Sequence, residues 1–198
     1  MTDVTAFVLA GGKSTRMGRD KAFLPWADGT LLSHALKLVV AVTPRTRIVG
    51  DRQKFASFGA VVEDIYRDRG PLGGIHAALL STTTDLNLML AVDLPLVEAR
   101  FLQFMVDLAK NTDATVIVPH AEGVSQPLCA VYRREFAQTA ELALQADRNK
   151  IDALFAQTKT RIIETDEWTR AGFSPAMFRN LNTHEEWQAE QRRSGSAP

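Results

Sequence analysis

Cysteine is almost absent from this sequence, because Cys129 is the single one among 198 residues. One cysteine cannot form an intrachain disulfide, and this composition is typical of proteins from a reducing cytoplasm. Cys129 lies in an apolar segment, so we expect it to be a small buried hydrophobic residue and not a nucleophile. The four histidines have no metal-ligand spacing, which argues against a zinc site. They are His34, His76, His120 and His184.

An excess of charge of one sign is also missing. The 23 basic and 23 acidic residues give a formal net charge of zero, so we expect neither nucleic acid nor an anionic membrane as a partner. No apolar run approaches the roughly 20 residues that cross a bilayer, and the N-terminus has no signal-peptide pattern. We therefore expect a cytoplasmic protein with one domain over residues 1–191 and a disordered tail over 192–198.

Apolar segments alternate along the chain with segments of helical periodicity. The continuous apolar run at 88–92 is what a strand covered on both faces requires. The alternation predicts an α/β fold, with an open, mostly parallel sheet and helices on both faces. Ligands in such folds bind at the carboxyl ends of the strands. Strands are predicted at 6–10, 47–49, 60–62, 86–92, 114–118 and 127–132, and helices at 31–42, 73–82, 98–110 and 135–146.

A glycine pair and a group of cations follow the first predicted strand. Gly11 and Gly12 end the strand, and glycines allow the backbone N–H groups to approach an anion closely. The cations that follow are Lys13, Arg16, Arg19 and Lys21. The pattern favours a phosphate-binding loop, although a glycine pair after a strand is also compatible with a simple tight turn.

Two common phosphate-binding motifs do not fit this loop. Gly12-Lys13-Ser14 resembles the end of a P-loop, but the place of its first glycine is taken by Phe7, inside the strand. Gly11 and Gly12 are adjacent, so the dinucleotide fingerprint Gly-x-Gly-x-x-Gly cannot be drawn either. A phosphate-binding loop at this place would therefore belong to another class of phosphate site.

Polar residues follow later strands in the same way. Asp93 comes directly after the apolar run at 88–92 and is a natural Mg²⁺ ligand, because Mg²⁺ takes one or two carboxylates together with phosphate oxygens. Alternatively, Asp93 caps the helix that begins near Glu98 or forms a turn with Pro95. Asp64 closes another strand and precedes a glycine-rich helix start at 70–74.

Asn180 and Asn182 alternate on an extended segment near the end of the chain. Their side chains therefore point the same way and are candidates for ligand contacts. The alternative is that Asn182 or Thr183 only caps the helix predicted to begin at His184.

Five motifs together carry a resemblance to a known family. They are Leu9-Ala10-Gly11-Gly12 with Arg16-Met17-Gly18 and Asp20-Lys21, Gly70-Pro71-Leu72-Gly73-Gly74, Asp93-Leu94-Pro95, Gln126-Pro127-Leu128 and Asn180-Leu181-Asn182-Thr183. In this order they resemble the motifs of the molybdenum cofactor guanylyltransferases, a family of nucleotidyltransferases with a Rossmann-like sheet. The resemblance spans residues 6–187, and the asparagine motif is what points to this family rather than to its relatives.

The resemblance implies a role for each matching residue. Nucleotide-binding positions would be Leu9, Ala10, Gly11, Gly12, Lys21, Asp64, Gly70, Gly74 and Asp93. Catalysis would rest on Arg16, Lys21 and Asp93, with Asp93 as the Mg²⁺ ligand, and the acceptor would lie against Asn180 and Asn182. Asp51 departs from the pattern, because some members of the family have an asparagine after the second strand, which leaves a guanine contact there open.

The implied reaction is transfer of GMP from GTP to the terminal phosphate of Mo-molybdopterin, with release of pyrophosphate. Mg²⁺ would be the cofactor, and molybdenum-inserting proteins and molybdoenzyme chaperones would be further partners. A phosphate monoester is largely ionised near pH 7, since its second pKa is about 6, so the reaction needs no dedicated general base. Two alternatives remain: a related nucleotidyltransferase that uses CTP or a sugar phosphate, and a nucleotide-binding adaptor without catalytic activity.

Overall fold

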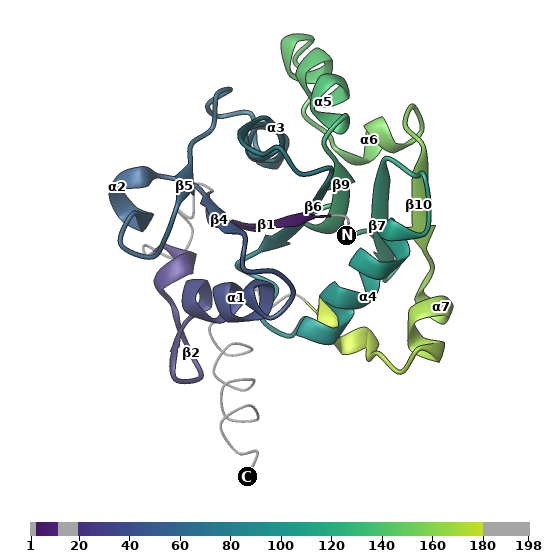
Figure 1. The fold of residues 1–198 in the computed structure, drawn as a ribbon, viewed down its shortest axis with the longest axis horizontal. Coiled ribbons are helices and arrows are strands. Elements are labelled where there is room, and N and C mark those ends of the chain that lie inside the picture. The colour runs from purple at the N-terminus through teal and green to yellow at the C-terminus, as the bar shows by residue number, and fades with distance from the viewer. Residues whose placement is uncertain (1–2, 12–19, 180–198) are drawn as a thin grey trace.

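The computed structural model describes residues 3–11 and 20–179 of the chain, which form one large sheet with helices on both sides (Figure 1). The strands are β1 (Val4–Leu9), β2 (Pro25–Trp26), β3 (Gly29–Thr30), β4 (Thr46–Val49), β5 (Val61–Val62), β6 (Leu86–Ala91), β7 (Val116–Ala121), β8 (Val124–Ser125), β9 (Cys129–Arg133) and β10 (Thr160–Ile163). The helices are α1 (Leu31–Val40), α2 (Arg52–Phe55), α3 (Pro71–Ser81), α4 (Ala99–Lys110), α5 (Phe136–Gln145), α6 (Asp152–Phe155) and α7 (Thr165–Arg170), with short 3₁₀ turns η2 (Lys21–Phe23) and η3 (Pro175–Phe178).

The order of strands across the sheet is β10-β7-β9-β6-β1-β4-β5. Along this order, neighbouring strands are parallel except at β9, which runs antiparallel to both β6 and β7. Outside this order, β8 pairs antiparallel with β7. Figure 1 shows α3 and α5 on one side of the sheet and α1 and α4 on the other. The expectation of an α/β fold with a mostly parallel, Rossmann-like sheet is therefore confirmed.

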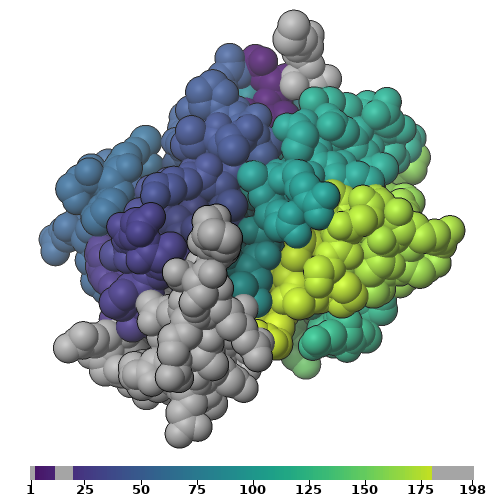
Figure 2. Space-filling view, turned by 90° about the horizontal axis from the view of Figure 1, so that it is seen from below, coloured from purple at the N-terminus to yellow at the C-terminus, as the bar shows by residue number. Residues whose placement is uncertain are grey.

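Burial explains why the central strands form. Every residue of β1 and of β6 is buried, and two-sided burial of this kind is typical of strands between helical layers. The last described segment, around η3, packs on α4: the Phe101 and Phe178 rings lie 5.6 Å apart, and Figure 2 shows this segment (yellow) against α4 (teal). Cys129 is fully buried as expected, and burial raises the pKa of its thiol.

The structure corrects several predicted bounds and adds short elements that the sequence did not predict. The predicted strands at 114–118 and 127–132 are displaced by one to three residues at their ends. The helices α2, α6 and α7 and the strand β10 were not predicted, because each has six residues or fewer and too little periodicity to recognise. The predicted boundary at residue 191 lies outside the described residues. Within the described part of the chain, no helix is both long and apolar enough to cross a membrane.

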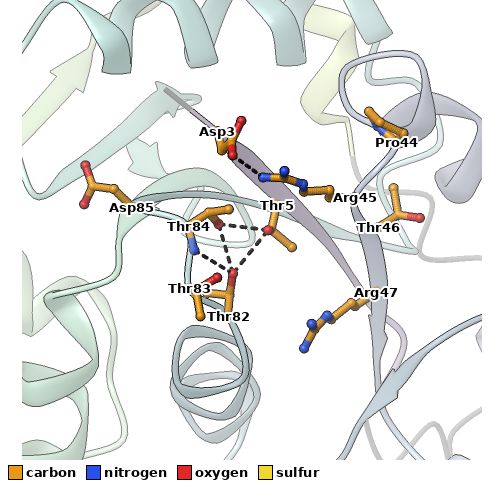
Figure 3. Close-up of a pocket in the computed structure, with 10 residues that line it drawn as sticks. All are labelled: Asp3, Thr5, Pro44, Arg45, Thr46, Arg47, Thr82, Thr83, Thr84 and Asp85. Atoms are coloured by element: carbon orange, nitrogen blue, oxygen red, sulfur yellow. Dashed lines mark hydrogen bonds and ion pairs between the residues drawn. The ribbon is translucent and has the colours of Figure 1, made fainter. Parts of the chain in front are cut away.

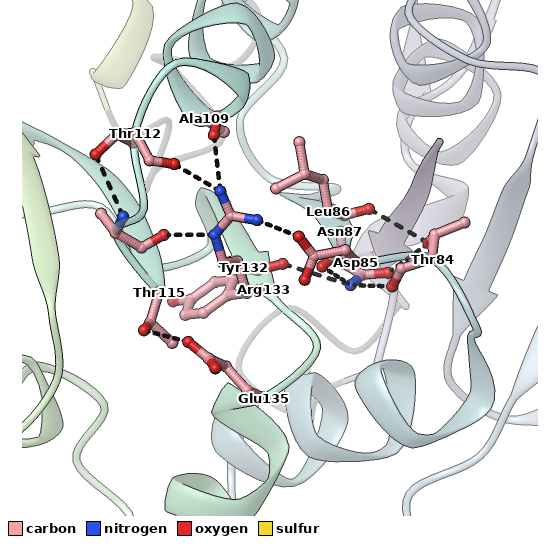
Figure 4. Close-up of polar contacts among 11 residues, drawn as sticks. Thr84, Asp85, Leu86, Asn87, Ala109, Thr112, Thr115, Tyr132, Arg133 and Glu135 are labelled. Carbon is pink, nitrogen blue, oxygen red and sulfur yellow. Dashed lines mark hydrogen bonds and ion pairs between the residues drawn. The ribbon is translucent and has the colours of Figure 1, made fainter. Parts of the chain in front are cut away.

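Polar networks close the edge of the sheet at which β1 and β6 begin. Arg133, at the end of β9, donates hydrogen bonds to the backbone carbonyls of Ala109, Thr112 and Ala114 and forms an ion pair with Asp85 (Figure 4). These bonds tie the C-terminal end of α4 to the sheet and satisfy carbonyls that the helix leaves without partners. This edge therefore has a structural role and lies opposite the carboxyl ends of β1 and β6.

Candidate active site

The strand order changes direction between β1 and β6, which makes this the expected place for a ligand. From β1 the chain continues to β4 on one side, and β6 lies on the other side. Leu9 pairs with Ala91, and the Val92 N–H donates to the Leu9 carbonyl at 3.2 Å. The segments that follow the two strands therefore leave the sheet side by side. In open α/β folds, ligands bind in the crevice at such a point.

Lys21 and Asp93 meet at this edge of the sheet. The Lys21 Nζ donates to the Asp93 Oδ2 at 3.3 Å, although the two residues are 72 positions apart in the chain. Their side chains are 38% and 45% exposed, so the pair faces solvent and is accessible to a ligand. Helix α4 begins at Ala99 with Glu98 as its N-cap, and so Asp93 does not cap this helix. The structure thus brings two of the predicted catalytic residues together.

Asp20 anchors the turn that carries Lys21. Its carboxylate accepts the Ala22 N–H at 3.2 Å as the N-cap of η2, and it also accepts a hydrogen bond from Lys54 Nζ at 2.9 Å. Lys54 lies on α2, and the Phe23 and Phe55 rings pack 5.6 Å apart beside this pair. The position of Lys21 is therefore fixed both by its own turn and by a neighbouring helix.

Glycines follow β1 and β4 and allow the two backbone segments to lie close together. The Ala10 and Gly11 N–H groups both donate to the Val49 carbonyl, at 2.9 and 3.1 Å. A Cβ on Gly50 would lie 2.7 Å from the Phe55 ring and 3.3 Å from the Gly11 nitrogen, so only glycine fits there. The sequence did not single out Gly50, because its need comes from packing against Phe55. Asp51 caps α2 by accepting the Gln53 N–H at 2.8 Å.

Asp64 presents a half-buried carboxylate beside the start of α3. Its oxygens lie 3.6 and 3.4 Å from where a Cβ on Gly73 or Gly74 would be, which is ordinary contact. The tighter limits come from the Tyr66 carbonyl, 2.8 Å from a Cβ on Gly73, and from Val49, 3.1 Å from a Cβ on Gly74. Burial raises the pKa of Asp64, and within the described residues no cation forms an ion pair with it. Gly70, the N-cap of α3, has φ +68, a conformation that favours glycine. A carboxylate held in this way is suited to accept hydrogen bonds from a ligand.

Three of the predicted nucleotide-binding residues lie along one edge of the sheet. Asp64 follows β5, Gly11 follows β1 and Asp93 follows β6, and the strand order is β5-β4-β1-β6. Three strand spacings, or about 14 Å, separate the two ends of this row. Gln126-Pro127-Leu128 lies at the same edge, because β9 is antiparallel and the Ala91 N–H donates to the Leu128 carbonyl at 2.8 Å.

Four predicted site residues lie outside the described part of the chain, namely Gly12, Arg16, Asn180 and Asn182. Their roles stay predictions. Among the described residues, no group of three or more His, Cys, Asp or Glu side chains is arranged to hold a metal ion. The accessible carboxylate of Asp93 nevertheless fits Mg²⁺, which commonly takes one or two protein carboxylates and completes its shell with phosphate oxygens and water.

A cavity of about 600 Å³ lies at the opposite edge of the sheet (Figure 3). It is lined by residues at the beginnings of β1, β4 and β6, and its floor is a buried network in which Thr82 and Thr84 donate to the Thr5 hydroxyl. Arg47 donates to the Ser81 carbonyl at 2.6 Å and so caps the end of α3. These contacts satisfy the polar groups internally, and none of the predicted site residues lines this cavity.

Comparison with known proteins agrees with this arrangement. The family model described as a MobA-like NTP transferase domain matches residues 6–163, from β1 to the end of β10. A probable molybdenum cofactor guanylyltransferase of Carboxydothermus hydrogenoformans is 30% identical over 192 residues, which is 95% of either chain. The molybdenum cofactor guanylyltransferase of Syntrophotalea carbinolica is 31% identical and covers 95% of this chain and 90% of its own.

Solved structures share the fold. Molybdopterin-guanine dinucleotide biosynthesis protein A of Archaeoglobus fulgidus superimposes with a TM-score of 0.83 at 20% identity, over 98% of this chain and all of the other. The CMP:2-keto-3-deoxy-manno-octonic acid synthetase complexed with CTP superimposes with a TM-score of 0.72 at 11% identity. The chain is thus a nucleotidyltransferase, and it belongs to the family of MobA-like NTP transferases.

Proposed function

We propose that this protein transfers GMP from GTP to the terminal phosphate of Mo-molybdopterin and releases pyrophosphate. The product is the guanine dinucleotide form of the molybdenum cofactor. The observation that carries the proposal is the Lys21–Asp93 pair at the edge of the sheet where the strand order changes direction. The names of the relatives at about 30% identity support guanine as the base and molybdopterin as the acceptor.

The reaction exchanges one phosphorus–oxygen bond for another. An oxygen of the acceptor phosphate attacks the α-phosphorus of GTP, and the bond from that phosphorus to the bridging oxygen of the β-phosphate breaks. Pyrophosphate leaves with the electron pair. Two anions must approach each other while charge builds up on the leaving group, so the protein has mainly to align and neutralise them.

Lys21 supplies positive charge to this reaction. Its ammonium is accessible and hydrogen-bonded only loosely to Asp93, at 3.3 Å, so it can turn toward a phosphate. Arg16 is proposed to assist it on the departing pyrophosphate. Asp93 would hold Mg²⁺, which when bound neutralises phosphate charge and orients the triphosphate. Because Lys21 and Asp93 are already paired, the free protein holds both charges at the site before the ligand arrives.

The nucleotide is proposed to lie along the row from Asp64 to Asp93. We propose that the Asp64 carboxylate accepts hydrogen bonds from the nucleoside and that the chain at the end of β1 lies near the phosphates. The nucleotide contacts proposed from the resemblance are Leu9, Ala10, Gly11, Gly12, Lys21, Asp64, Gly70, Gly74 and Asp93, and the acceptor contacts are Asn180 and Asn182. Since Asp51 caps α2, we propose no guanine contact for its carboxylate.

The setting of the reaction is part of the proposal. We propose one domain over residues 1–191 and a cytoplasmic location, which the single, fully buried cysteine supports. Molybdenum-inserting proteins and molybdoenzyme chaperones are proposed as partners that supply the acceptor and receive the product.

The test is a turnover assay with GTP labelled at the α-phosphate, Mg²⁺ and Mo-molybdopterin. We expect the label to appear in the pterin product together with an equal amount of pyrophosphate, and we expect chelation of divalent metal to stop both. CTP and a sugar phosphate serve as competing substrates. Preferred transfer from CTP would contradict the choice of base, and GTP binding without pyrophosphate release would identify an adaptor instead.

A further inference from the structure

A histidine of α1 contacts the turn that carries Asp93. The His34 Nε2 lies 2.9 Å from the Pro95 carbonyl oxygen, across 61 positions of sequence. A carbonyl oxygen can only accept, so the ring must carry its proton on Nε2 and donate it. Pro95 is two residues beyond Asp93, and this contact therefore reaches the segment that places the carboxylate.

The turn after β6 has few strong bonds of its own. The Leu94 N–H donates to the Ala91 carbonyl at 3.4 Å, and the Val97 N–H donates to the Leu94 carbonyl at 3.3 Å. Both backbone bonds are long, and Pro95 has no N–H with which to form another. The hydrogen bond from His34 is shorter than either, so it is well placed to hold the turn.

The same helix also holds the turn that carries Lys21. The Leu31 N–H, at the start of α1, donates to the Leu24 carbonyl at 3.0 Å, and the Leu24 N–H donates to the Lys21 carbonyl at 3.0 Å. A capping box between Thr30 and Ser33 fixes the first turn of α1. The beginning of α1 is thus connected to both members of the Lys21–Asp93 pair.

Packing fixes the His34 ring in its place. The ring lies 6.0 Å from the ring of Trp26, which is only 3% exposed. Burial lowers the pKa of His34 and so favours the neutral ring, whose proton on Nε2 serves the Pro95 carbonyl. Strands β2 and β3 pair as an antiparallel hairpin. The contact between the Trp26 and His34 rings packs this hairpin against α1.

We propose that His34 is a positioning residue for nucleotidyl transfer, whose hydrogen bond to Pro95 sets where Asp93 stands relative to Lys21. The inference rests on the proposed function, since it gives His34 a role through Asp93. His34 itself need not touch GTP or the acceptor. Its loss should therefore reduce the rate of transfer more than it reduces nucleotide affinity, because misplacement of reacting groups acts on alignment.

Three substitutions separate the hydrogen bond from packing. In His34→Gln the amide nitrogen stands as many bonds from Cβ as Nε2 does and can donate to Pro95. In His34→Asn the nitrogen corresponds to Nδ1 and falls short, and His34→Leu keeps an apolar side chain without a donor. We expect kcat to fall about tenfold to a hundredfold in the Asn and Leu variants, with a smaller loss of GTP affinity, and we expect activity to be restored in the Gln variant.

Hydrogen exchange of residues 91–97, followed by mass spectrometry of the full chain, gives a readout that does not depend on turnover. We expect faster exchange of this segment in the Asn and Leu variants and wild-type exchange in the Gln variant. Equal kcat in the Gln and Asn variants, or unchanged exchange in the Leu variant, would overturn the inference. If the wild-type chain transfers no GMP, the proposed function fails, and the role of His34 in catalysis fails with it. The exchange measurement still shows separately whether the hydrogen bond of His34 holds the turn.

Discussion

The Lys21–Asp93 pair can be tested by measuring stability and activity on the same variants. We choose Lys21→Met, which keeps the aliphatic chain and removes the charge, and Asp93→Asn, which keeps the shape and removes a strong metal ligand. If the pair serves catalysis, each change should leave folding nearly intact and strongly reduce turnover. If the pair is only a structural ion pair, the reverse should hold.

The structure sets the size of both effects. The two side chains are 38% and 45% exposed and their closest atoms are 3.3 Å apart, and pairs of this kind contribute about 0–1 kcal/mol to stability. For a chain of this length, about 1 kcal/mol changes the melting temperature by about 2–4 °C. Removing a group that stabilises developing charge costs about 10²–10³ in rate. The expected loss of activity is therefore far larger than any loss of stability.

Lys110→Met is the matched control. The Lys110 side chain is also 38% exposed and forms an ion pair with Asp107 at 3.0 Å, but it lies at the end of α4, near the opposite edge of the sheet. The assays are thermal unfolding and GTP-dependent pyrophosphate release with Mo-molybdopterin. We expect the control to match the wild type in both. Wild-type turnover in Lys21→Met or Asp93→Asn, accompanied by a clear loss of stability, would refute the assignment.

Three further predictions concern folding and its pH dependence. Arg133→Met leaves three backbone carbonyls without their donor. It should lower the free energy of unfolding by about 2–4 kcal/mol in denaturant titrations. The control Arg170→Met, at an exposed position, should change the free energy of unfolding by less than about 0.5 kcal/mol. Asp64→Asn should be more stable than the wild type near neutral pH, because burial raises the pKa of Asp64 and its charged form therefore costs stability. This advantage should shrink as the pH falls through the raised pKa and the wild-type carboxyl becomes protonated, and a constant difference would contradict it. His76 is buried, and neither ring nitrogen has a hydrogen-bond partner among the described residues. Burial lowers its pKa from 6.5, so the wild type should lose stability relative to His76→Phe as the pH falls below about 6.5, which melting temperatures over a pH series will show.

The first half of the fold could be predicted from sequence because its signals are local. Continuous apolar runs identify β1 and β6, and polar residues directly after them had to meet at one edge once the strands were parallel. The rule placed Asp93 at this edge, but the hydrogen bond between Lys21 and Asp93 was not predicted and is a finding of the structure. Phe7, inside the strand, was enough to exclude a P-loop.

The second half could not be predicted in the same way. An apolar strand such as β9 has the same pattern in either direction, so its antiparallel pairing was not visible. The chain reverses direction before β9 in the β7–β8 hairpin, which turns at Glu122 and Gly123. Both residues have positive φ. Gly50 and His34 owe their roles to contacts with Phe55 and Pro95, and contacts between distant residues leave no local pattern in the sequence.

The proposed activity of this chain is the joining of GMP to a phosphate-bearing pterin. The most direct measurement is the release of pyrophosphate from GTP in the presence of Mg²⁺, with and without Mo-molybdopterin. We expect release only when the acceptor is present, with one pyrophosphate formed for each guanylylated pterin and little release from CTP. Tight GTP binding without pyrophosphate release, or equal release from CTP, would contradict it.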